Sequence, residues 1–251
     1  WCGAPCSSQQ MKLDRGHRVP VLLVEIRNAL DECEGFATEG IFRLAPATEE
    51  REALLAALRD APLTMAQLNG ATGIALANLI KIYLRELPND LFGEVREEVD
   101  ASVLAGSGGG DDERPMQLAK RLTGARAEVV RWTLDMMASV VEHQPTNRMD
   151  ERAVAVVFAP NVVRTDAAVA EGAAPMTPME ELDYAAKAVG WLESLLKAHM
   201  AARAAKARTG SASATGVQSS VAGVVSASHR SSDESPNSLS SRALSEASLR
   251  N

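Results

Sequence analysis

The chain has 251 residues, of which 46% are hydrophobic and 24% are charged, a composition that supports one sizeable hydrophobic core with some chain left over. Its formal net charge of -7 disfavours a basic surface for nucleic acid, so proteins are the expected partners. No apolar run reaches the ~20 residues that cross a bilayer, so no transmembrane segment is expected.

The three cysteines are too few and too scattered to predict a disulfide framework. Two lie in the N-terminal WCGAPC, and the third, Cys33, ends an apolar segment. The four histidines are scattered as well, and without a Cys/His cluster the sequence predicts no metal site. A reducing, cytoplasmic setting fits these features best.

Amphipathic helices are predicted soon after the N-terminus. Residues 1–18 show no periodicity, and residues 1–10 are expected to be a flexible segment. A first helix is predicted from about Pro20 to Cys33, because the fixed φ of proline suits the first turn. Residues 48–60, TEEREALLAALRD, predict a second helix with Thr48 as its cap and glutamates in its first turn.

The run GIALANLIKIYLREL, residues 73–87, predicts a third helix because its apolar side chains recur every three or four positions. The side chains expected to be buried there are those of Ile74, Leu79, Ile80, Tyr83, Leu84 and Leu87. Pro88 ends this helix. Residues 89–105 predict another helix, and the glycine-rich GSGGGDDERP that follows predicts an exposed connector.

Residues 124–143 and 149–160 predict two further helices. Pro160 is expected to cut the second of them short, because proline cannot donate the helical hydrogen bond, and this places Asn161 at a junction of helix and loop. Residues 178–200 predict a last helix. Its expected buried face is formed by Leu182, Ala185, Val189, Leu192 and Leu196.

From residue 201 onward the chain is rich in Ser and Ala and too poor in apolar side chains to offset the entropy of ordering. Residues 201–251 are therefore expected to be a disordered tail, although the basic piece AARAAKAR at its start also fits an extension of the last helix. Alternation typical of strands is essentially absent. The predicted fold is all-α, a bundle of about seven to eight helices.

No enzyme template fits the chain: it lacks a phosphate-binding loop, a dinucleotide fingerprint and a nucleophile elbow. Four polar residues remain as candidates. Lys81 and Arg85 share a helix face, and their spacing alone favours a solvated helix edge. Asn161 equally fits a turn residue that bonds its own backbone, and Arg43 fits an ordinary loop arginine.

Three segments together, however, resemble the Rho GTPase-activating (RhoGAP) domain, and within it the plant and algal type that acts on Rho-of-plants GTPases. EGIFRLA resembles the arginine-finger motif of that family, LIKIYLRELPNDLF its Lys- and Arg-bearing helix, and NRMDERAVAVVFAPNVV its late helix ending in asparagine. The plant type is indicated by MKLDRGHRVPVLL and FAPN. The resemblance covers residues 11–200 in the family's order and spacing, and it implies a single RhoGAP-like helical bundle over that range.

The resemblance implies a GTPase-activating protein that binds the GTP-bound form of a Rho-family GTPase (Rho, Rac or Rho-of-plants) and switches off its signalling. Arg43 would be the arginine finger, the catalytic residue that enters the partner's site. GTP and Mg²⁺ belong to the partner, so no cofactor and no self-contained enzymatic site are expected. The expected location is cytoplasmic, with recruitment to membranes through the GTPase.

The same resemblance implies roles for the neighbouring residues. Lys81 and Asn161 would contact the GTPase, and Arg85 would brace the finger loop. Ile41 and Phe42 would anchor the root of that loop, because burying two apolar side chains reduces the cost of ordering the finger.

Two other functions stay open at this point. The same fold could hold a GTPase without accelerating hydrolysis, as a binding or scaffold module, although such a module has no need of Arg43. A generic helical scaffold would require three motifs in the family's order to be coincidences.

Overall fold

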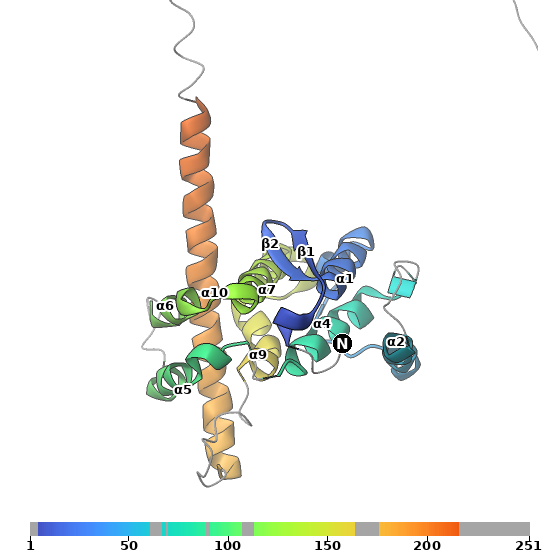
Figure 1. Cartoon of the computed structure of the whole chain (residues 1–251), viewed down its shortest axis with the longest axis horizontal. Coiled ribbons are helices and arrows are strands. Elements are labelled where there is room, and N and C mark those ends of the chain that lie inside the picture. The colour runs from blue at the N-terminus through green and yellow to red at the C-terminus, as the bar shows by residue number, and fades with distance from the viewer. Residues whose placement is uncertain are drawn as a thin grey trace, which may run out of the picture. The chain divides into compact units, whose positions relative to one another are not determined.

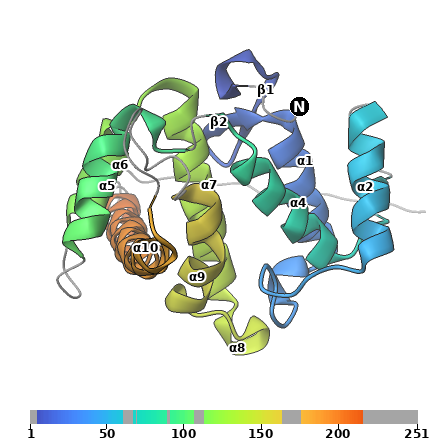
Figure 2. The same ribbon diagram turned by 90° about the horizontal axis from the view of Figure 1, so that it is seen from below.

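Helix α7 (Gly124–Glu142) is the central element of the fold, and the majority of its 19 residues are buried. In the computed structural model it contacts strand β2 (His17–Pro20) and the helices α6 (Arg114–Arg121), α8 (Gln144–Asn147) and α9 (Glu151–Val162). Figure 1 gives the arrangement. Figure 2 shows α7 and α9 between two groups of helices: α1 (Val21–Glu32) and α4 (Gly73–Arg85) on one side, and α5 (Arg96–Ala105), α6 and α10 (Pro178–Thr215) on the other. The structure describes residues 5–60, 67–68, 70–88, 91–106, 113–163 and 176–215.

The all-α prediction is confirmed, because the described residues form nine α-helices and a single small hairpin. The helices other than α7 are α1 (Val21–Glu32), α2 (Thr48–Asp60), α4 (Gly73–Arg85), α5 (Arg96–Ala105), α6 (Arg114–Arg121), α8 (Gln144–Asn147), α9 (Glu151–Val162) and α10 (Pro178–Thr215). Short 3₁₀ helices occur at η1 (Cys6–Ser8), η2 (Gly35–Ala37) and η3 (Gly93–Val95). Of these, α6 and the one-turn α8 were not predicted. None of the described helices has both the length and the apolar character that crossing a membrane requires.

The N-terminal hairpin corrects the expectation that strands are absent. Strand β1 (Met11–Asp14) pairs antiparallel with β2 (His17–Pro20), and Asp14 lies opposite His17 in the register. The two residues between them, Arg15 and Gly16, have φ of 47° and 89°. Two positive φ values are the signature of the tight turn that matches the twist of a hairpin. The strands are only four residues long, and the short apolar alternation of β1 does not match its burial, since Leu13 is exposed and Asp14 is buried.

Helix α9 runs past Pro160 to Val162, so the expectation that Pro160 cuts the helix short is wrong. The proline lies in the last turn, where it removes only the one hydrogen bond that its own nitrogen would donate. The helical pattern continues after it, since the Val163 N–H donates to the Ala159 carbonyl at 2.8 Å. Asn161 therefore belongs to the last turn of α9 rather than to a loop.

The buried face of α10 differs from the predicted one. Leu182 is 67% exposed and Ala185 is also exposed, whereas Leu192 and Leu196 are buried as expected. The residues of α10 that pack into the core are Tyr184, Ala188, Trp191, Leu192, Leu195 and Leu196. The two aromatic side chains set the orientation of the helix, since they bury the largest apolar areas and also need polar partners for their O–H and N–H groups. Those partners are on α5, where the Tyr184 hydroxyl donates to Asp100 at 2.5 Å and the Trp191 indole donates to Ser102 at 3.1 Å.

The end of α10 also lies beyond the predicted domain boundary at residue 200. The helix continues to Thr215, and its extension begins with Ala, Arg and Lys residues, which have high helix propensity. Residues 1–207 form one compact unit, and of residues 208–251 the structure describes only the end of α10. The disorder expected after Thr215 lies outside the described residues and stays a prediction.

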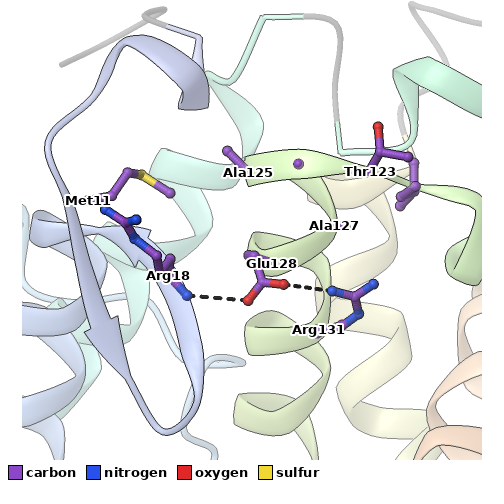
Figure 3. Close-up of a pocket in the computed structure, with 9 residues that line it drawn as sticks. Met11, Arg18, Thr123, Ala125, Ala127, Glu128 and Arg131 are labelled. Carbon is purple, nitrogen blue, oxygen red and sulfur yellow. Dashed lines mark hydrogen bonds and ion pairs between the residues drawn. The ribbon is translucent and has the colours of Figure 1, made fainter.

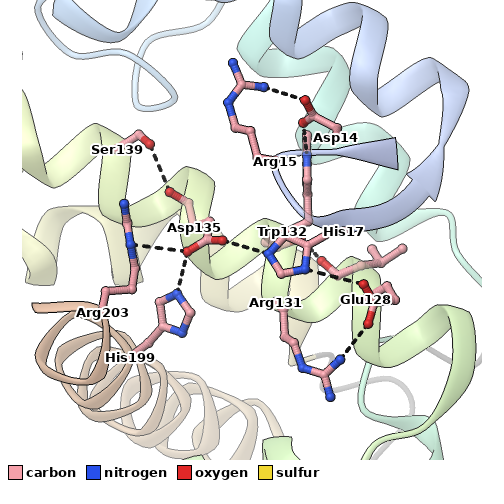
Figure 4. Close-up of polar contacts among 12 residues, drawn as sticks. Asp14, Arg15, His17, Glu128, Arg131, Trp132, Asp135, Ser139, His199 and Arg203 are labelled. Carbon is pink, nitrogen blue, oxygen red and sulfur yellow. Dashed lines mark hydrogen bonds and ion pairs between the residues drawn. The ribbon is translucent and has the colours of Figure 1, made fainter. Parts of the chain in front are cut away.

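Asp135 of α7 joins two segments that are distant in sequence (Figure 4). His17 of the hairpin places Nε2 2.8 Å from Oδ2 of Asp135, and His199 of α10 places Nε2 2.8 Å from Oδ1. The Arg203 guanidinium is 3.4 Å from the same carboxylate. Burial alone would raise the pKa of Asp135, but the hydrogen bonds from His199 and His17 overcome it and lower that pKa to about 2. The carboxylate therefore holds the hairpin and α10 against α7.

We expect Asp135→Asn to lower the free energy of unfolding by about 2 kcal/mol at pH 7, because a folded-state pKa near 2 against an ordinary value of 3.8 stabilises the folded state. This contribution is complete above about pH 4 and is lost as the pH falls through the folded-state pKa, so the difference between variant and wild type should narrow toward pH 3. Urea denaturation at pH 7, 5 and 3 measures it. Glu142→Gln is the control: it removes an exposed partner of the same Arg203 and should lower the free energy of unfolding by less than about 0.5 kcal/mol. A difference for Asp135→Asn that stays constant down to pH 3 would contradict the assignment.

Candidate functional site

The loop between η2 and α2, residues 38–47 and called the Arg43 loop below, places a buried side chain directly before an exposed one. Ile41 is 0% and Phe42 is 1% exposed, whereas the Arg43 side chain is exposed to solvent. The Phe42 ring packs on Phe158 of α9 with the ring centroids 4.9 Å apart. Both side chains of the apolar pair are thus buried, and their predicted role in anchoring an arginine finger stays a prediction.

The backbone of the Arg43 loop is closed by its own hydrogen bonds. The N–H groups of Arg43 and Leu44 both donate to the Gly40 carbonyl at 2.9 Å. Gly40 has φ +68°, and a Cβ added to it would lie 2.9 Å from Cγ of Leu44. Phe42 also has a positive φ, 64°, which is uncommon for a residue with a bulky side chain. Buried packing and hydrogen bonds thus hold an unfavourable turn, and the Arg43 side chain next to it is exposed.

Lys81 of α4 bonds to the same turn. Its Nζ donates to the Phe42 carbonyl at 2.5 Å, and its side chain is half-buried. Burial lowers the pKa of Lys81, and the nearby charge of Arg85 lowers it further. The ammonium and the Arg43 loop are therefore in direct contact. Arg85 lies at the exposed end of α4, and its predicted bracing of the loop stays a prediction.

Asn161 of α9 is 8% exposed, and its amide donates to the Val157 carbonyl of the same helix at 2.8 Å. The simpler interpretation, an asparagine that bonds its own backbone, thus describes its contact in the free protein. Asn161 lies within one turn of Phe158, which packs on Phe42, so α9 carries both residues close to the base of the Arg43 loop. Its predicted contact with a partner stays a prediction.

Sequence reasoning missed Asn147, the last residue of α8, which is 0% exposed. Its amide donates to the carbonyls of Phe36 at 2.8 Å and Val140 at 2.7 Å, and its side-chain oxygen accepts the Met149 N–H at 2.8 Å. Its backbone carbonyl accepts the Gly40 N–H at 2.8 Å. The residue opens the segment NRMDERAVAVVFAPNVV, but nothing in the local pattern indicates which carbonyls it reaches.

A pocket of about 540 Å³ lies elsewhere, between the hairpin and the start of α7 (Figure 3). Its charged groups already bond one another: Glu128 accepts from the Arg131 guanidinium at 2.7 Å and from the Arg18 backbone N–H at 3.3 Å. None of the predicted site residues lines it. In the part of the chain that the structure describes, no three His, Cys, Asp or Glu side chains are grouped to hold a metal ion.

Lys81 therefore bonds the Arg43 loop directly, and α9 packs on the loop through Phe158. Residues 20–167 match the model of the RhoGAP domain. The chain belongs to the RhoGAP family. The RhoGAP resemblance seen in the three sequence segments is thereby confirmed, and the region covering Arg43, Lys81, Arg85 and Asn161 lies inside the match.

Relatives of this RhoGAP chain include Rho GTPase-activating protein 1 of Arabidopsis thaliana, which is 29% identical over 78% of this chain and 38% of its own length. Rho GTPase-activating protein gacA of Dictyostelium discoideum is 29% identical over 73% of this chain and 49% of its own length. The chain thus spans no more than about half of these two proteins.

Solved structures give the same fold. The crystal structure of human Rho GTPase activating protein 15 superposes with a TM-score of 0.58 at 16% identity, over 72% of this chain and 82% of that one. The BH domain of GRAF, the GTPase regulator associated with focal adhesion kinase, gives 0.54 at 17% identity, over 71% and 90%.

We expect Phe42→Ala to lower the free energy of unfolding by about 3 to 5 kcal/mol, because it empties a fully buried aromatic site. Leu44→Ala, two residues along the same loop, is the matched control: Leu44 is 45% exposed, and its truncation should cost less than about 1 kcal/mol. Chemical denaturation followed by circular dichroism measures both. Equal losses for the two variants would show that Phe42 does not anchor the loop.

Proposed function

We propose that this RhoGAP chain is a GTPase-activating protein that binds the GTP-bound form of a Rho-family GTPase and inserts Arg43 into its active site. The observation that carries the proposal is that Arg43 is exposed while Phe42, the residue before it, is buried and accepts a hydrogen bond from Lys81 at its carbonyl. The names of the relatives, which are Rho GTPase-activating proteins, agree with it.

The chemistry of GTP hydrolysis explains what an exposed arginine would contribute. Charge spreads over the oxygens of the transferring phosphoryl group in the transition state, and a GTPase alone stabilises it incompletely. A guanidinium suits this task because its planar fork can bond two oxygens at once and it stays protonated at any working pH. Arginine fingers in general accelerate hydrolysis by about 10³ to 10⁵, which corresponds to roughly 4 to 7 kcal/mol of barrier.

The anchoring of the loop contributes to this function through entropy. A mobile loop would lose conformational freedom when Arg43 entered the partner, and that cost would reduce the stabilisation of the transition state. In this chain the loop is already ordered by folding, because Ile41 and Phe42 are buried and Lys81 bonds the Phe42 carbonyl. Less conformational entropy is therefore left to lose on binding. GTP and Mg²⁺ come with the partner, so the chain acts as an activator and adds one catalytic group in trans.

The first test compares Arg43→Ala with wild type in a single-turnover GTP hydrolysis assay on a panel of Rho-, Rac- and Ras-type GTPases. We expect Arg43→Ala to lose at least about 10³ in maximal stimulated rate while most of the binding remains, because the finger acts in the transition state. Arg51→Ala, an exposed arginine on α2, is the control and should stimulate as wild type does. Wild-type binding without stimulation would replace this proposal with the binding-module alternative.

The second test concerns the face around the loop. We expect Asn161→Ala to weaken association with the GTPase loaded with a non-hydrolysable GTP analogue by about tenfold, since a docking contact of ~1.4 kcal/mol corresponds to that factor. Lys81→Ala should lower both this affinity and the maximal rate, because Lys81 also bonds the Arg43 loop. Calorimetric titration gives the affinities, and Lys120→Ala on α6 is the exposed control. Unchanged affinity in both variants would place the docking face elsewhere.

A further inference from the structure

We propose that Asn147 is a positioning residue for Arg43: it fixes the Arg43 loop at two points and so sets where the guanidinium lies when a GTPase is bound. This inference rests on the proposed function, because it assigns a part in stimulated hydrolysis to a residue that no partner can touch. Asn147 is 0% exposed. Its effect must therefore pass through the loop.

The first point of attachment is the root of the loop. The Asn147 amide donates to the Phe36 carbonyl at 2.8 Å, and the Phe36 ring is itself held on two sides. The Arg27 guanidinium lies 5.4 Å from the centroid of that ring, and the His143 ring stacks on it with centroids 6.2 Å apart. Arg27 is only 4% exposed, so its contact with the ring belongs to the core, whereas His143 is exposed.

The second point of attachment is Gly40. Its N–H donates to the Asn147 backbone carbonyl at 2.8 Å, and its own carbonyl accepts the Arg43 N–H at 2.9 Å. A continuous chain of hydrogen bonds thus runs from Asn147 through Gly40 to the backbone of Arg43. The other side-chain bonds of Asn147, to Val140 and Met149, hold the amide itself in one orientation.

The consequence for function is specific. Removing the Asn147 side chain frees the Phe36 carbonyl and removes the bonds that hold the turn at residue 147, from which the backbone carbonyl bonds Gly40. The substitution does not alter the residues of the proposed docking face, Lys81 and Asn161. The GTPase should therefore still bind. The Arg43 guanidinium should then be displaced or occupy several positions, so that it stabilises the transition state less. A misplacement of about 1 Å costs on the order of 10² in rate.

The experiment is a double-mutant cycle with the intact chain. Asn147→Ala, Arg43→Ala and the double variant are assayed for maximal stimulated hydrolysis at saturating activator and for affinity toward a GTPase loaded with a non-hydrolysable GTP analogue. We expect Asn147→Ala to lower the maximal rate by about 10- to 100-fold and to change affinity by less than about threefold. In the Arg43→Ala background the same substitution should have no further effect on rate, because no finger remains to be positioned.

The control for a merely structural defect is Ser102→Ala, which also removes a buried hydrogen-bond partner, that of the Trp191 indole, but lies on α5 away from the Arg43 loop contacts. It should lose stability without losing maximal rate. If Asn147→Ala does not fold, Asn147→Ser, which keeps a small polar group at the site, replaces it and should show the same division between rate and affinity.

The outcomes separate this inference from the proposed function. A wild-type chain that stimulates no GTPase overturns both. Stimulation lost in Arg43→Ala but retained in a folded Asn147 variant overturns only the positioning role. Equal rate losses from the Asn147 substitution with and without Arg43 would also overturn it, because the loss would then come from general destabilisation.

Discussion

The structure depends on one constraint, which is that adjacent residues of the Arg43 loop must lie in opposite environments. The apolar Phe42 side chain is buried in the core, whereas the charged Arg43 side chain is exposed to water. A turn with positive φ at Phe42 meets both needs, but such a turn is unfavourable for a bulky residue by itself. The turn persists for two reasons. The Phe42 ring packs on Phe158, and the Lys81 ammonium donates a hydrogen bond to the Phe42 carbonyl.

This constraint explains why elements from distant parts of the sequence meet at the loop. Helix α4 contributes Lys81, α9 contributes Phe158, and the turn after α7 contributes Asn147. Because the contacts that hold the loop are also contacts of the core, the loop cannot keep its conformation if the core is disrupted. A substitution at Phe42 is therefore expected to affect folding and function together, whereas Arg43, which is exposed, can be changed with little cost to the fold.

Much of this arrangement could be predicted from the sequence. The apolar spacing of α4 gives most of its buried face correctly, although Ile74 is only half-buried. The motif resemblance identifies the Arg43 loop and the two helices, α4 and α9, that contact it. The failures have physical causes. The hairpin depends on a two-residue turn and on packing against α7, and the short apolar alternation of β1 does not match which of its side chains are buried. The orientation of α10 depends on which carboxylate and hydroxyl Tyr184 and Trp191 reach, so spacing favoured Leu182 wrongly. Asn147 acts through carbonyls 7 and 111 residues away, and a local pattern cannot indicate them.

The bond between Asn147 and Val140 connects the central helix to the site. Val140 lies in the last turn of α7, and its carbonyl already accepts the backbone N–H of His143, the residue that ends the helix, at 3.2 Å. The Asn147 amide donates a second hydrogen bond to that carbonyl with one N–H and bonds the Phe36 carbonyl with the other. One side chain therefore joins the end of α7 to the root of the Arg43 loop. Asp135 also holds α7 to the hairpin and to α10. The Arg43 loop is therefore connected through α7 to the rest of the core and not only to its immediate neighbours.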